Sequence, residues 1–451
     1  MDTIAAISTP LGNGGIGIIR ISGNKSVEIV KNIFVTSNDS YKPNTIVYGK
    51  IIHNGEFIDD ALVSYFKSPN SYTGEDVIEI NSHGGMIVLK RILDIILSLG
   101  AKLAEPGEFT KRAFLNGKMD LSQAESVMDI INSKTNLENK ISAKVLNGEL
   151  GRKIRNIRDD ILDVLVDLEA NIDYPEYDIE EISREKVLKV ISKNIIELEK
   201  LSSSYNEGKL VKDGINVAIV GKPNVGKSSL LNRLLNEERA IVTDIAGTTR
   251  DTIEESIVYK GLVINLIDTA GIHDTEDIVE KIGVKKSIDA LNGADVIFMI
   301  IDNSSKLSKE DIDLLEQIKD KNKYLLINKI DINEDIEPQL IEYVDKKDVF
   351  MISAKENIGI EEVLDRLLMD FSFDTIKKND ELVISNIRHK EAIDNTIRSL
   401  INTKESCENG VPLDMVSIDI QNAIAYLGEI LGESVSDDVI NGIFKKFCLG
   451  K

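Results

Sequence analysis

The sequence predicts a multidomain protein that combines α/β and all-α parts: an N-terminal α+β domain, a helical domain, and an α/β domain inserted into the helical one. Length and hydrophobic patterning support this prediction. With 451 residues, the chain is long enough for about three domains of ordinary size. Its pattern changes from strand-like to helical after residue 118, back to strand-like from residue 215, and to helical again after residue 376.

The N-terminal domain is predicted to cover residues 1–117. Short β-type runs at residues 16–21 and 77–80 alternate with a helical stretch at residues 87–99. This alternation is typical of a compact α+β domain.

The helical domain is predicted to combine residues 118–212 with residues 376–451. Near its start, Ser122 and Glu125 have the spacing of a capping box, which predicts a helix N-terminus. Further along, apolar residues recur on one helical face and predict a long amphipathic helix. They are Ile154, Ile157, Ile161, Leu165 and Leu168.

The inserted domain is predicted to cover residues 214–372. Apolar runs of strand length alternate here with segments of helix length, which predicts a parallel α/β sheet. The runs are residues 217–220, 263–267, 296–301 and 324–327. An amphipathic helix at residues 360–369 is predicted to end the domain.

Composition excludes several classes of protein. Hydrophobic residues make up 42% and charged residues 29% of the chain, which is ordinary for a folded globular protein. The longest apolar strand candidate stops at Asp302, far short of the ~20 residues that cross a bilayer. The acidic N-terminus lacks the basic stretch of a secretory signal, so a cytoplasmic location is expected. Two cysteines are too few for a disulfide framework.

The net charge of −22 disfavours general attraction to nucleic acid. A nucleic-acid partner would therefore have to meet a local basic patch, although solvated helix faces are the default interpretation of such clusters. The two candidate clusters are Arg152, Lys153, Arg155 and Arg158, and Lys445, Lys446 and Lys451.

Residues 221–228, Gly-Lys-Pro-Asn-Val-Gly-Lys-Ser, directly follow a predicted strand and precede a helical pattern. This is a P-loop in the context that it requires. Its glycines let backbone N–H groups turn towards a phosphate, and the helix N-terminus adds positive potential. Lys227 is expected to reach the outer phosphates, and the Ser228 hydroxyl to bind Mg²⁺.

Further motifs follow the other predicted strands and indicate GTP rather than ATP. Asp268, with Gly271 three residues on, supplies a carboxylate for the magnesium shell and a backbone N–H for the γ-phosphate. Asp331 can accept from the ring N–H and the exocyclic amine of guanine, which adenine does not present there. Residues 353–355 supply a backbone N–H to the guanine oxygen. The motifs have the order and spacing of the Ras-like P-loop GTPases.

The candidate GTP-binding residues extend over all these motifs and over a switch segment at residues 243–251. They are Asn224, Val225, Gly226, Lys227, Ser228, Ser229, Thr243, Asp244, Ile245, Ala246, Gly247, Thr248, Thr249, Asp268, Thr269, Ala270, Gly271, Asn328, Lys329, Asp331, Ser353, Ala354 and Lys355.

Water attack must be organised differently from Ras-type enzymes, because Ile272 stands where their water-orienting glutamine follows Asp-x-x-Gly. Glu280 is the candidate carboxylate that positions the water, with a solvated helix residue as the alternative. The P-loop contains no arginine. The side-chain oxygen of Asn224 could hold a monovalent cation near the phosphates, with ordinary loop hydrogen bonding as the alternative.

Distinctive segments also occur outside the nucleotide motifs, at residues 2–6, 14–23, 72–76, 83–85, 106–118 and 447–451. Together with the GTPase motifs, they make the chain resemble the MnmE (TrmE) family of tRNA-modification GTPases over essentially its whole length. One departure is Leu449, because the family's usual ending is Cys-Ile-Gly-Lys.

The resemblance implies an N-terminal folate-binding domain that dimerises and takes 5-formyl- or 5,10-methylene-tetrahydrofolate, a helical domain made from both flanks, and the inserted G domain. It implies a heterotetramer with the flavoprotein MnmG, which uses FAD and NADH. Together the two proteins would add a carboxymethylaminomethyl or aminomethyl group at C5 of the wobble uridine, U34, of certain tRNAs. The G domains would bind K⁺ and pair across the homodimer during hydrolysis.

The resemblance also implies roles for single residues. The K⁺ ligands would be Asn224, Thr243, Ile245 and Thr248, the Mg²⁺ ligands Ser228 and Thr249, and the folate contacts Arg20, Glu79, Lys118 and Lys451. Glu280 would position the water. Taken alone, Glu79 and Lys118 would be interpreted as exposed charges. The resemblance makes Cys448 a candidate for direct chemistry, with an idle thiol as the alternative.

Two other functions remain open on the sequence. An Era-like ribosome-assembly GTPase would act as a switch and modify nothing, but it leaves the first hundred residues and residues 448–451 unexplained. A signalling or structural GTPase that acts only through protein partners would bind neither folate nor tRNA.

Overall fold

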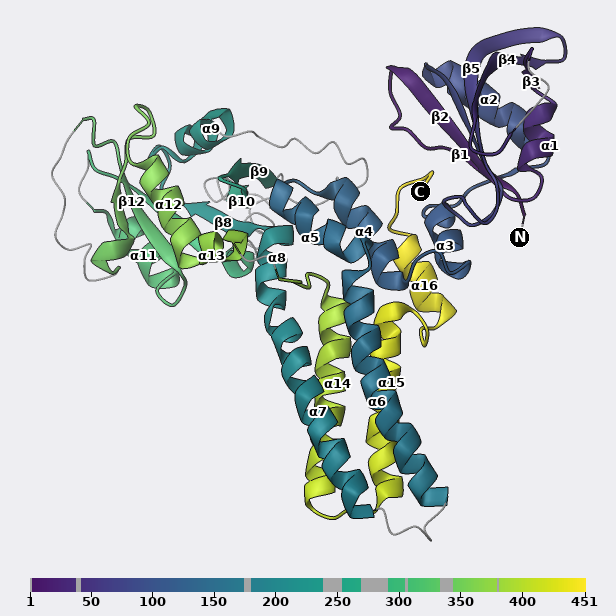
Figure 1. Cartoon of the computed structure of the whole chain (residues 1–451). Coiled ribbons are helices and arrows are strands. Elements are labelled where there is room, and N and C mark those ends of the chain that lie inside the picture. Colours follow the sequence, from purple (N-terminus) through teal and green to yellow (C-terminus); the bar gives the residue numbers. More distant parts are fainter. Residues whose placement is uncertain are drawn as a thin grey trace, which may run out of the picture. The chain divides into compact units, whose positions relative to one another are not determined.

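The computed structural model (Figure 1) describes residues 2–37, 42–173, 180–237, 254–268, 291–304, 307–332, 344–378 and 381–451. The chain forms two compact units. The first contains residues 1–131, 142–199 and 391–451, and the second contains residues 132–141 and 200–390. None of the helices in these described ranges is long and apolar enough to cross a lipid bilayer.

A sheet of seven described strands begins the first unit, in the order β3-β4-β5-β6-β2-β1-β7. Its pairs are antiparallel except for β1 with β7. Alternate residues of each strand face the helices, as the two-residue period of a strand requires. Ile19 and Ile21 of β2 are fully buried in one cluster with Ile92 of α2. The elements are β1 (Ile4–Ile7), β2 (Gly14–Ser22), α1 (Ser26–Lys31), β3 (Phe34–Val35), β4 (Ile46–His53), β5 (Glu56–Phe66), β6 (Val77–Gly84), α2 (Met86–Ser98) and β7 (Lys102–Leu103).

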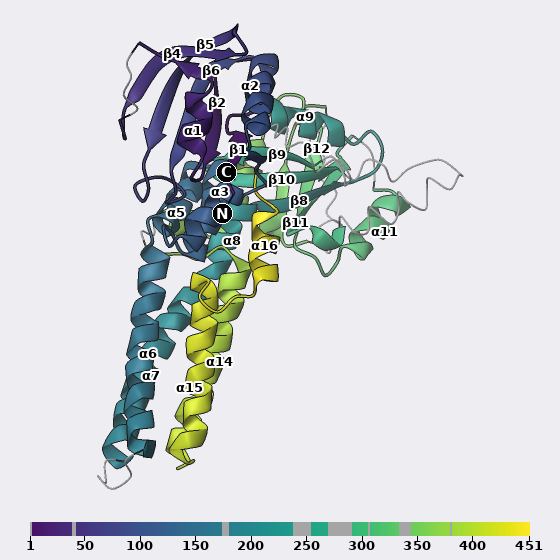
Figure 2. The ribbon, with the colours of Figure 1, turned by 90° about the vertical axis from the view of Figure 1, so that its right-hand side faces the viewer.

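Four long helices lie side by side in two views of the molecule (Figures 1 and 2). They are α6 (Glu149–Asp173), α7 (Glu180–Ser203), α14 (Ile387–Glu408) and α15 (Leu413–Leu431). All five residues predicted to form the apolar face of α6 are buried, so that prediction is confirmed. The shorter helices of the flanking segments are α3 (Glu108–Leu115), α4 (Leu121–Asn132), α5 (Asn136–Leu146) and α16 (Asp437–Phe444).

The predicted capping box at Ser122 is wrong, because α4 already begins at Leu121. Asp120 takes the capping position: its Oδ1 accepts from the Gln123 backbone N–H at 3.0 Å, and Gln123 Oε1 accepts from the Asp120 N–H at 3.1 Å. Ser122 donates its hydroxyl to the same carboxylate at 2.6 Å. Asp-x-x-Gln and Ser-x-x-Glu have the same spacing, and the carboxylate two residues earlier is the stronger acceptor.

The second unit contains a sheet of six described strands in the order β13-β12-β11-β8-β10-β9. The predicted parallel sheet is confirmed for β8, β10, β11 and β12. Two strands that were not predicted extend it: β13 pairs parallel with β12, and β9 pairs antiparallel with β10. The two-residue turn Lys260-Gly261 explains this hairpin, since both residues have positive φ. The strands are β8 (Ile215–Val220), β9 (Glu254–Tyr259), β10 (Leu262–Asp268), β11 (Val296–Asp302), β12 (Lys323–Asn328) and β13 (Val349–Met351).

Helices cover both faces of this second sheet. Val217 of β8 packs in a cluster with Leu234 of α9 and Leu367 of α12. The next residue, Ala218, belongs to a separate cluster with Leu315 of α11. Burial on both faces explains why these strands are continuous apolar runs. The helices of this unit are α8 (Tyr205–Asp213), α9 (Lys227–Glu237), α11 (Lys309–Gln317), the 3₁₀ helix η3 (Lys346–Asp348), α12 (Ile360–Asp370) and α13 (Phe373–Lys378).

Candidate functional site

The P-loop connects β8 to α9, and its backbone explains its sequence. Gly221 and Gly226 have φ of +151° and +107°, and Asn224 has φ of +63°, a conformation that glycine adopts freely and asparagine tolerates. A Cβ on Gly226 would lie 2.2 Å from Asn328 Nδ2. The loop therefore lies directly against β12, at the carboxyl edge of the sheet.

Lys227, the first residue of α9, is held by the loop that precedes it. Its Nζ donates to the carbonyl oxygens of Gly221 and Lys222 at 2.6 and 2.8 Å. Ser228 and Ser229 lie exposed in the first turn of the same helix. An ammonium group and hydroxyl oxygens thus share the N-terminus of a helix, where the helix dipole favours anions.

Asn328 joins the P-loop to the loop that follows β13. Only 2% of this residue is exposed. Its Nδ2 donates to the Val225 carbonyl oxygen at 2.7 Å, and its Oδ1 accepts from the Ala354 backbone N–H at 2.9 Å. One side chain therefore fixes the spacing between the phosphate end and the base end of the predicted nucleotide site.

The base end contains an exposed carboxylate with a fixed orientation. The Ser353 hydroxyl donates to Asp331 Oδ1 at 2.6 Å, and this hydrogen bond lowers the pKa of Asp331 below its usual value. The neighbouring Lys355 carbonyl oxygen accepts from Arg233 of α9 at 2.7 Å. An ionised carboxylate beside a backbone N–H is the arrangement that guanine recognition requires.

Several predicted nucleotide residues lie outside the described residues. They are Thr243, Asp244, Ile245, Ala246, Gly247, Thr248, Thr249, Thr269, Ala270, Gly271 and Glu280. Asp268 is described as the last residue of β10. Since parallel strands end at one edge, the backbone of Asp268 lies at the same edge as the P-loop.

A second cluster forms in the first unit around Arg20 of β2. Arg20 Nε donates to Glu79 Oε1 of the adjacent β6 at 2.9 Å. The guanidinium carbon also lies 5.2 Å from the ring centre of Tyr72 and 5.6 Å from that of Phe109. Cation–π attraction and the ion pair therefore hold the planar guanidinium in one orientation. We call these four residues the Arg20 cluster.

Residues 448–451 complete the surroundings of the Arg20 cluster. Arg20 Nη1 and the Ser8 hydroxyl both donate to the Gly450 carbonyl oxygen, at 3.4 and 3.0 Å. The Phe109 backbone N–H, at the start of α3, donates to the Lys451 carbonyl oxygen at 3.1 Å. Burial, together with the charge of Arg20, lowers the pKa of the Lys451 ammonium. Cys448 is exposed.

The predicted folate contacts are only partly brought together. Arg20, Glu79 and Lys451 lie close to one another, whereas Lys118 donates to the Pro69 carbonyl oxygen at 3.0 Å. The Lys118 side chain therefore packs against the loop of residues 67–76, which also carries Tyr72. Sequence reasoning did not assign Tyr72 and Phe109, although both stand in segments that carried the family resemblance.

The cluster Arg152, Lys153, Arg155 and Arg158 is engaged within the first unit. Arg152 donates to the Asn147 carbonyl oxygen at 2.9 Å, and the other three residues pair with carboxylates. These ion pairs are Lys153 with Glu197, Arg155 with Asp120, and Arg158 with Glu433. Their charge is largely neutralised locally, so this cluster is a poor candidate for binding nucleic acid.

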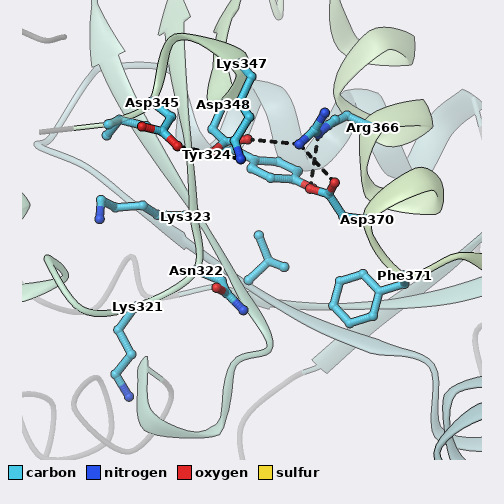
Figure 3. Close-up of a pocket in the computed structure, with 12 residues that line it drawn as sticks. Lys321, Asn322, Lys323, Tyr324, Asp345, Lys347, Asp348, Arg366, Asp370 and Phe371 are labelled. Carbon is cyan, nitrogen blue, oxygen red and sulfur yellow. Dashed lines mark hydrogen bonds and ion pairs between the residues drawn. The ribbon is translucent and has the colours of Figure 1, made fainter.

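A pocket of about 570 Å³ lies at the opposite edge of the second sheet, where β11 and β12 begin (Figure 3). In it, the Tyr324 hydroxyl and Arg366 Nε both donate to Asp370 Oδ2, at 2.7 and 3.1 Å. Burial and the nearby Asp370 raise the pKa of Tyr324. The residues lining this pocket include none of the predicted site residues, so it is distinct from the nucleotide edge.

Two family models together match almost the whole chain. One, described as the MnmE helical domain, matches residues 121–448, and the other, described as the N-terminus of the GTP-binding protein TrmE, matches residues 3–118. The tRNA modification GTPase MnmE of Clostridioides difficile (strain 630) is 48% identical over 455 residues, which cover 100% of this chain and 99% of that protein. The chain belongs to the MnmE family of tRNA-modification GTPases.

A second MnmE relative, from Acetivibrio thermocellus, is 49% identical with the same coverage. Among solved structures, the G domain of the FeoB iron transporter of T. maritima is 28% identical and covers 35% of this chain and 98% of that one, with a TM-score of 0.27. Membership of the MnmE family makes the chain a GTP hydrolase of tRNA modification, which uses Mg²⁺ with the nucleotide. The Era-like alternative is not favoured, because the MnmE-family matches include residues 3–118.

Proposed function

We propose that this chain hydrolyses GTP with the help of K⁺ and, with the flavoprotein MnmG, adds a carboxymethylaminomethyl or aminomethyl group at C5 of U34 in certain tRNAs. Its working form in the cytoplasm is a homodimer within a heterotetramer. Membership of the family over the whole chain is the observation that carries the proposal. The nucleotide edge described above supports its first step.

In that step, water attacks the γ-phosphate in line with the leaving diphosphate. Lys227 lies at a helix N-terminus and takes up charge that develops on the phosphate oxygens. Ser228 is exposed beside it and, with Thr249, offers the hydroxyl oxygens that Mg²⁺ prefers. Magnesium supplies positive charge to the β- and γ-phosphates when it is bound. Glu280 is proposed to position the water.

The chemistry of Asn224 suits a monovalent cation. Asn224 lies in the P-loop, where its backbone has a left-handed conformation and the residue is exposed. An amide oxygen is a hard ligand of the kind that K⁺ accepts. Thr243, Ile245 and Thr248 are proposed as the other K⁺ ligands. In residues 268–271, the Asp268 carboxylate is proposed to hold the hydration shell of Mg²⁺ and the Gly271 N–H to meet the γ-phosphate. The cation supplies the positive charge that an arginine finger provides in other GTPases.

The Arg20 cluster suits a tetrahydrofolate. The Tyr72 and Phe109 rings offer flat surfaces, and the Glu79 carboxylate accepts hydrogen bonds of the kind that a pterin donates. Lys118 and Lys451 add positive charge for the folate carboxylates. The folate carries the one-carbon unit when it is bound, while FAD and NADH act on the partner protein. Cys448, exposed beside this cluster, is proposed to act on a reaction intermediate.

The first experiment compares GTP hydrolysis by the wild-type protein in KCl and in NaCl at equal ionic strength. We expect at least tenfold faster hydrolysis in KCl, and loss of that difference in the Asn224→Ala variant. The mass in solution is measured with GDP and with a transition-state mimic, which is expected to pair the G domains. Equal rates in both salts would remove the K⁺ part of the proposal.

The second experiment adds MnmG, FAD, NADH, a tetrahydrofolate and tRNA, and measures modified U34 by mass spectrometry. Binding of 5-formyl-tetrahydrofolate is measured in parallel by calorimetry. We expect Arg20→Ala to abolish both folate binding and modification. Arg91→Ala, which removes an exposed arginine of the same domain, is the matched control. If neither folate nor tRNA binds the wild-type protein, a GTPase that acts only through protein partners becomes the better interpretation.

A further inference from the structure

The end of β11 and the first turn of α11 contact opposite ends of the nucleotide edge, although no nucleotide motif includes either segment. At the end of β11, Asp302 Oδ2 accepts from Lys329 Nζ at 2.5 Å. In the first turn of α11, Asp311 Oδ2 accepts from Lys222 Nζ at 2.7 Å. Lys329 belongs to the guanine motif, and Lys222 is the second residue of the P-loop. Of these two carboxylates, Asp311 is the more deeply buried, with 1% of its side chain exposed against 14% for Asp302.

Asp311 is held rigidly on α11. Only 1% of the residue is exposed. It forms a reciprocal capping box with Ser308: the Ser308 N–H donates to Asp311 Oδ2 at 2.9 Å, and the Ser308 hydroxyl accepts from the Asp311 N–H at 3.4 Å. Its other oxygen, Oδ1, is buried without a hydrogen-bond partner among the described residues. The Ser308 hydroxyl also donates to Oδ2 at 2.9 Å, and the Lys222 ammonium supplies the positive charge that offsets this buried carboxylate.

Lys222 connects Asp311 to the phosphate end of the site, because its side chain binds Asp311 and its backbone contacts Lys227. Its side chain is also largely buried, with 15% exposed. Its carbonyl oxygen, together with that of Gly221, accepts from Lys227 Nζ. The side chain that Asp311 holds and the carbonyl group that orients Lys227 therefore belong to the same residue. Small displacements of such a group lower the rate strongly, because charge stabilisation depends on preorganised geometry.

We propose that Asp311 is a positioning residue for GTP hydrolysis: through Lys222 it fixes the first half of the P-loop and thereby the direction of the Lys227 ammonium. This inference rests on the GTPase activity of the chain and adds a residue outside its motifs. Asp311 does not touch the nucleotide. Its effect is expected at the phosphate end only, since the base end is held by the Ala354 N–H on Asn328 Oδ1 and by the Ser353 hydroxyl on Asp331.

The test measures kcat and KM for GTP, affinities for GDP and inosine diphosphate, and melting temperature. The variants are Lys222→Met, Asp311→Asn and the double variant, in which no buried charge is left unpaired. We expect each single variant to melt lower, and the double variant to melt close to the wild type. In all three, kcat falls about tenfold or more. The affinities for both diphosphates fall by the same factor, because recognition of the base is unchanged.

Lys222→Arg preserves the ion pair and is expected to retain most of the activity. Lys319→Met, which removes an exposed lysine near the end of α11, is the matched control and should leave kcat unchanged. The proposal is overturned if the double variant has both the melting temperature and the kcat of the wild type. It is also overturned if discrimination between GDP and inosine diphosphate collapses, since that indicates general loosening of the site. Should the double variant not fold, equal kcat for Lys222→Arg and Lys222→Gln overturns it.

Failure of this inference is distinguishable from failure of the proposed function. A wild-type protein that hydrolyses no GTP in either salt removes the proposed function itself. A wild-type protein that is active, with variants that are equally active, removes only the role of Asp311.

Discussion

The nucleotide edge and the Arg20 cluster are built in different ways. Each part of the nucleotide edge is a short contiguous motif at the end of a strand, and the parallel sheet brings the motifs to one edge. The Arg20 cluster has no contiguous motif of its own. It joins neighbouring strands to the start of α3 and to a segment 430 residues further along the chain. A site of the first kind is positioned mainly by the sheet that carries it, whereas a site of the second kind depends on long-range docking.

Of the four substitutions that follow, Asp331→Asn is expected to change ligand affinity most. Its effect should be confined to nucleotide binding, with folate affinity unchanged. The amide presents a donor where guanine also donates, so GDP affinity should fall about 100-fold. Xanthosine diphosphate, which has an acceptor at that position, should bind better than GDP. Fluorescence titration measures both affinities, with Asp320→Asn, at an exposed aspartate, as the control. An unchanged GDP affinity would contradict the assignment of Asp331.

Gly450→Ala tests long-range docking at the Arg20 cluster. Gly450 has φ of +88°, and a Cβ would lie 2.4 Å from the Ile7 carbonyl oxygen. The strained segment should shift, and affinity for 5-formyl-tetrahydrofolate should fall about tenfold, with GDP affinity unchanged. Gly442→Ala is the matched control, because nothing lies within 4 Å of its added Cβ. Equal folate affinity in the two variants would show that the segment does not shape the cluster.

Asp120→Ala is expected to lower the stability of the first unit without changing either binding site. It removes the cap of α4 and the partner of Arg155, so the free energy of unfolding should fall by about 2 kcal/mol. Urea denaturation followed by circular dichroism measures the change, and Asp159→Ala, at an exposed aspartate of α6, is the control. A loss of GDP affinity in this variant would mean that the two regions are energetically coupled.

The smallest expected effect is the contribution of Lys451 to the pH dependence of stability. Its pKa is lowered from 10.5 in the folded protein, first by burial and then by Arg20. The unfolded chain therefore binds the proton more tightly, so the charged lysine costs stability at neutral pH, and this cost disappears as the pH rises towards 10.5. The free energy of unfolding of Lys451→Met at pH 7 should exceed that of the wild type by less than about 1 kcal/mol, because the Lys451 side chain is partly exposed, and its melting temperature should be slightly higher. A difference in melting temperature that stays constant up to pH 10 would contradict this linkage.

The same contrast explains what the sequence could predict. Four strands of the second sheet, β8, β10, β11 and β12, were located to within two residues, because strands buried on both faces are unbroken apolar runs. The three-residue β13 was not predicted. The edge strand β9 was not predicted, since its first residues are the polar Glu254, Glu255 and Ser256. The pairing of β9 with β10 depends on the Lys260-Gly261 turn, a local signal that could have indicated the hairpin.

Side-chain contacts between distant segments were the least predictable features. Arg20 and Glu79 were assigned through a family resemblance, and no local pattern places Tyr72 or Phe109 beside them. Lys222 and Asp311 are 89 residues apart in the numbering, and each taken alone is an ordinary charged residue. Burial, which depends on the assembled fold, is what makes this pair informative.

The hydrogen bond between Ser8 and Gly450, 442 residues apart, has a consequence for the order of folding during synthesis. The strands β1 and β2 leave the ribosome first, but one of their partners is translated only near residue 450. At about 5–20 residues per second, synthesis of the intervening chain takes roughly 20 to 90 seconds. The nucleotide-binding sheet, whose contacts span much shorter separations, is therefore complete before the first domain to be synthesised has acquired its final surroundings.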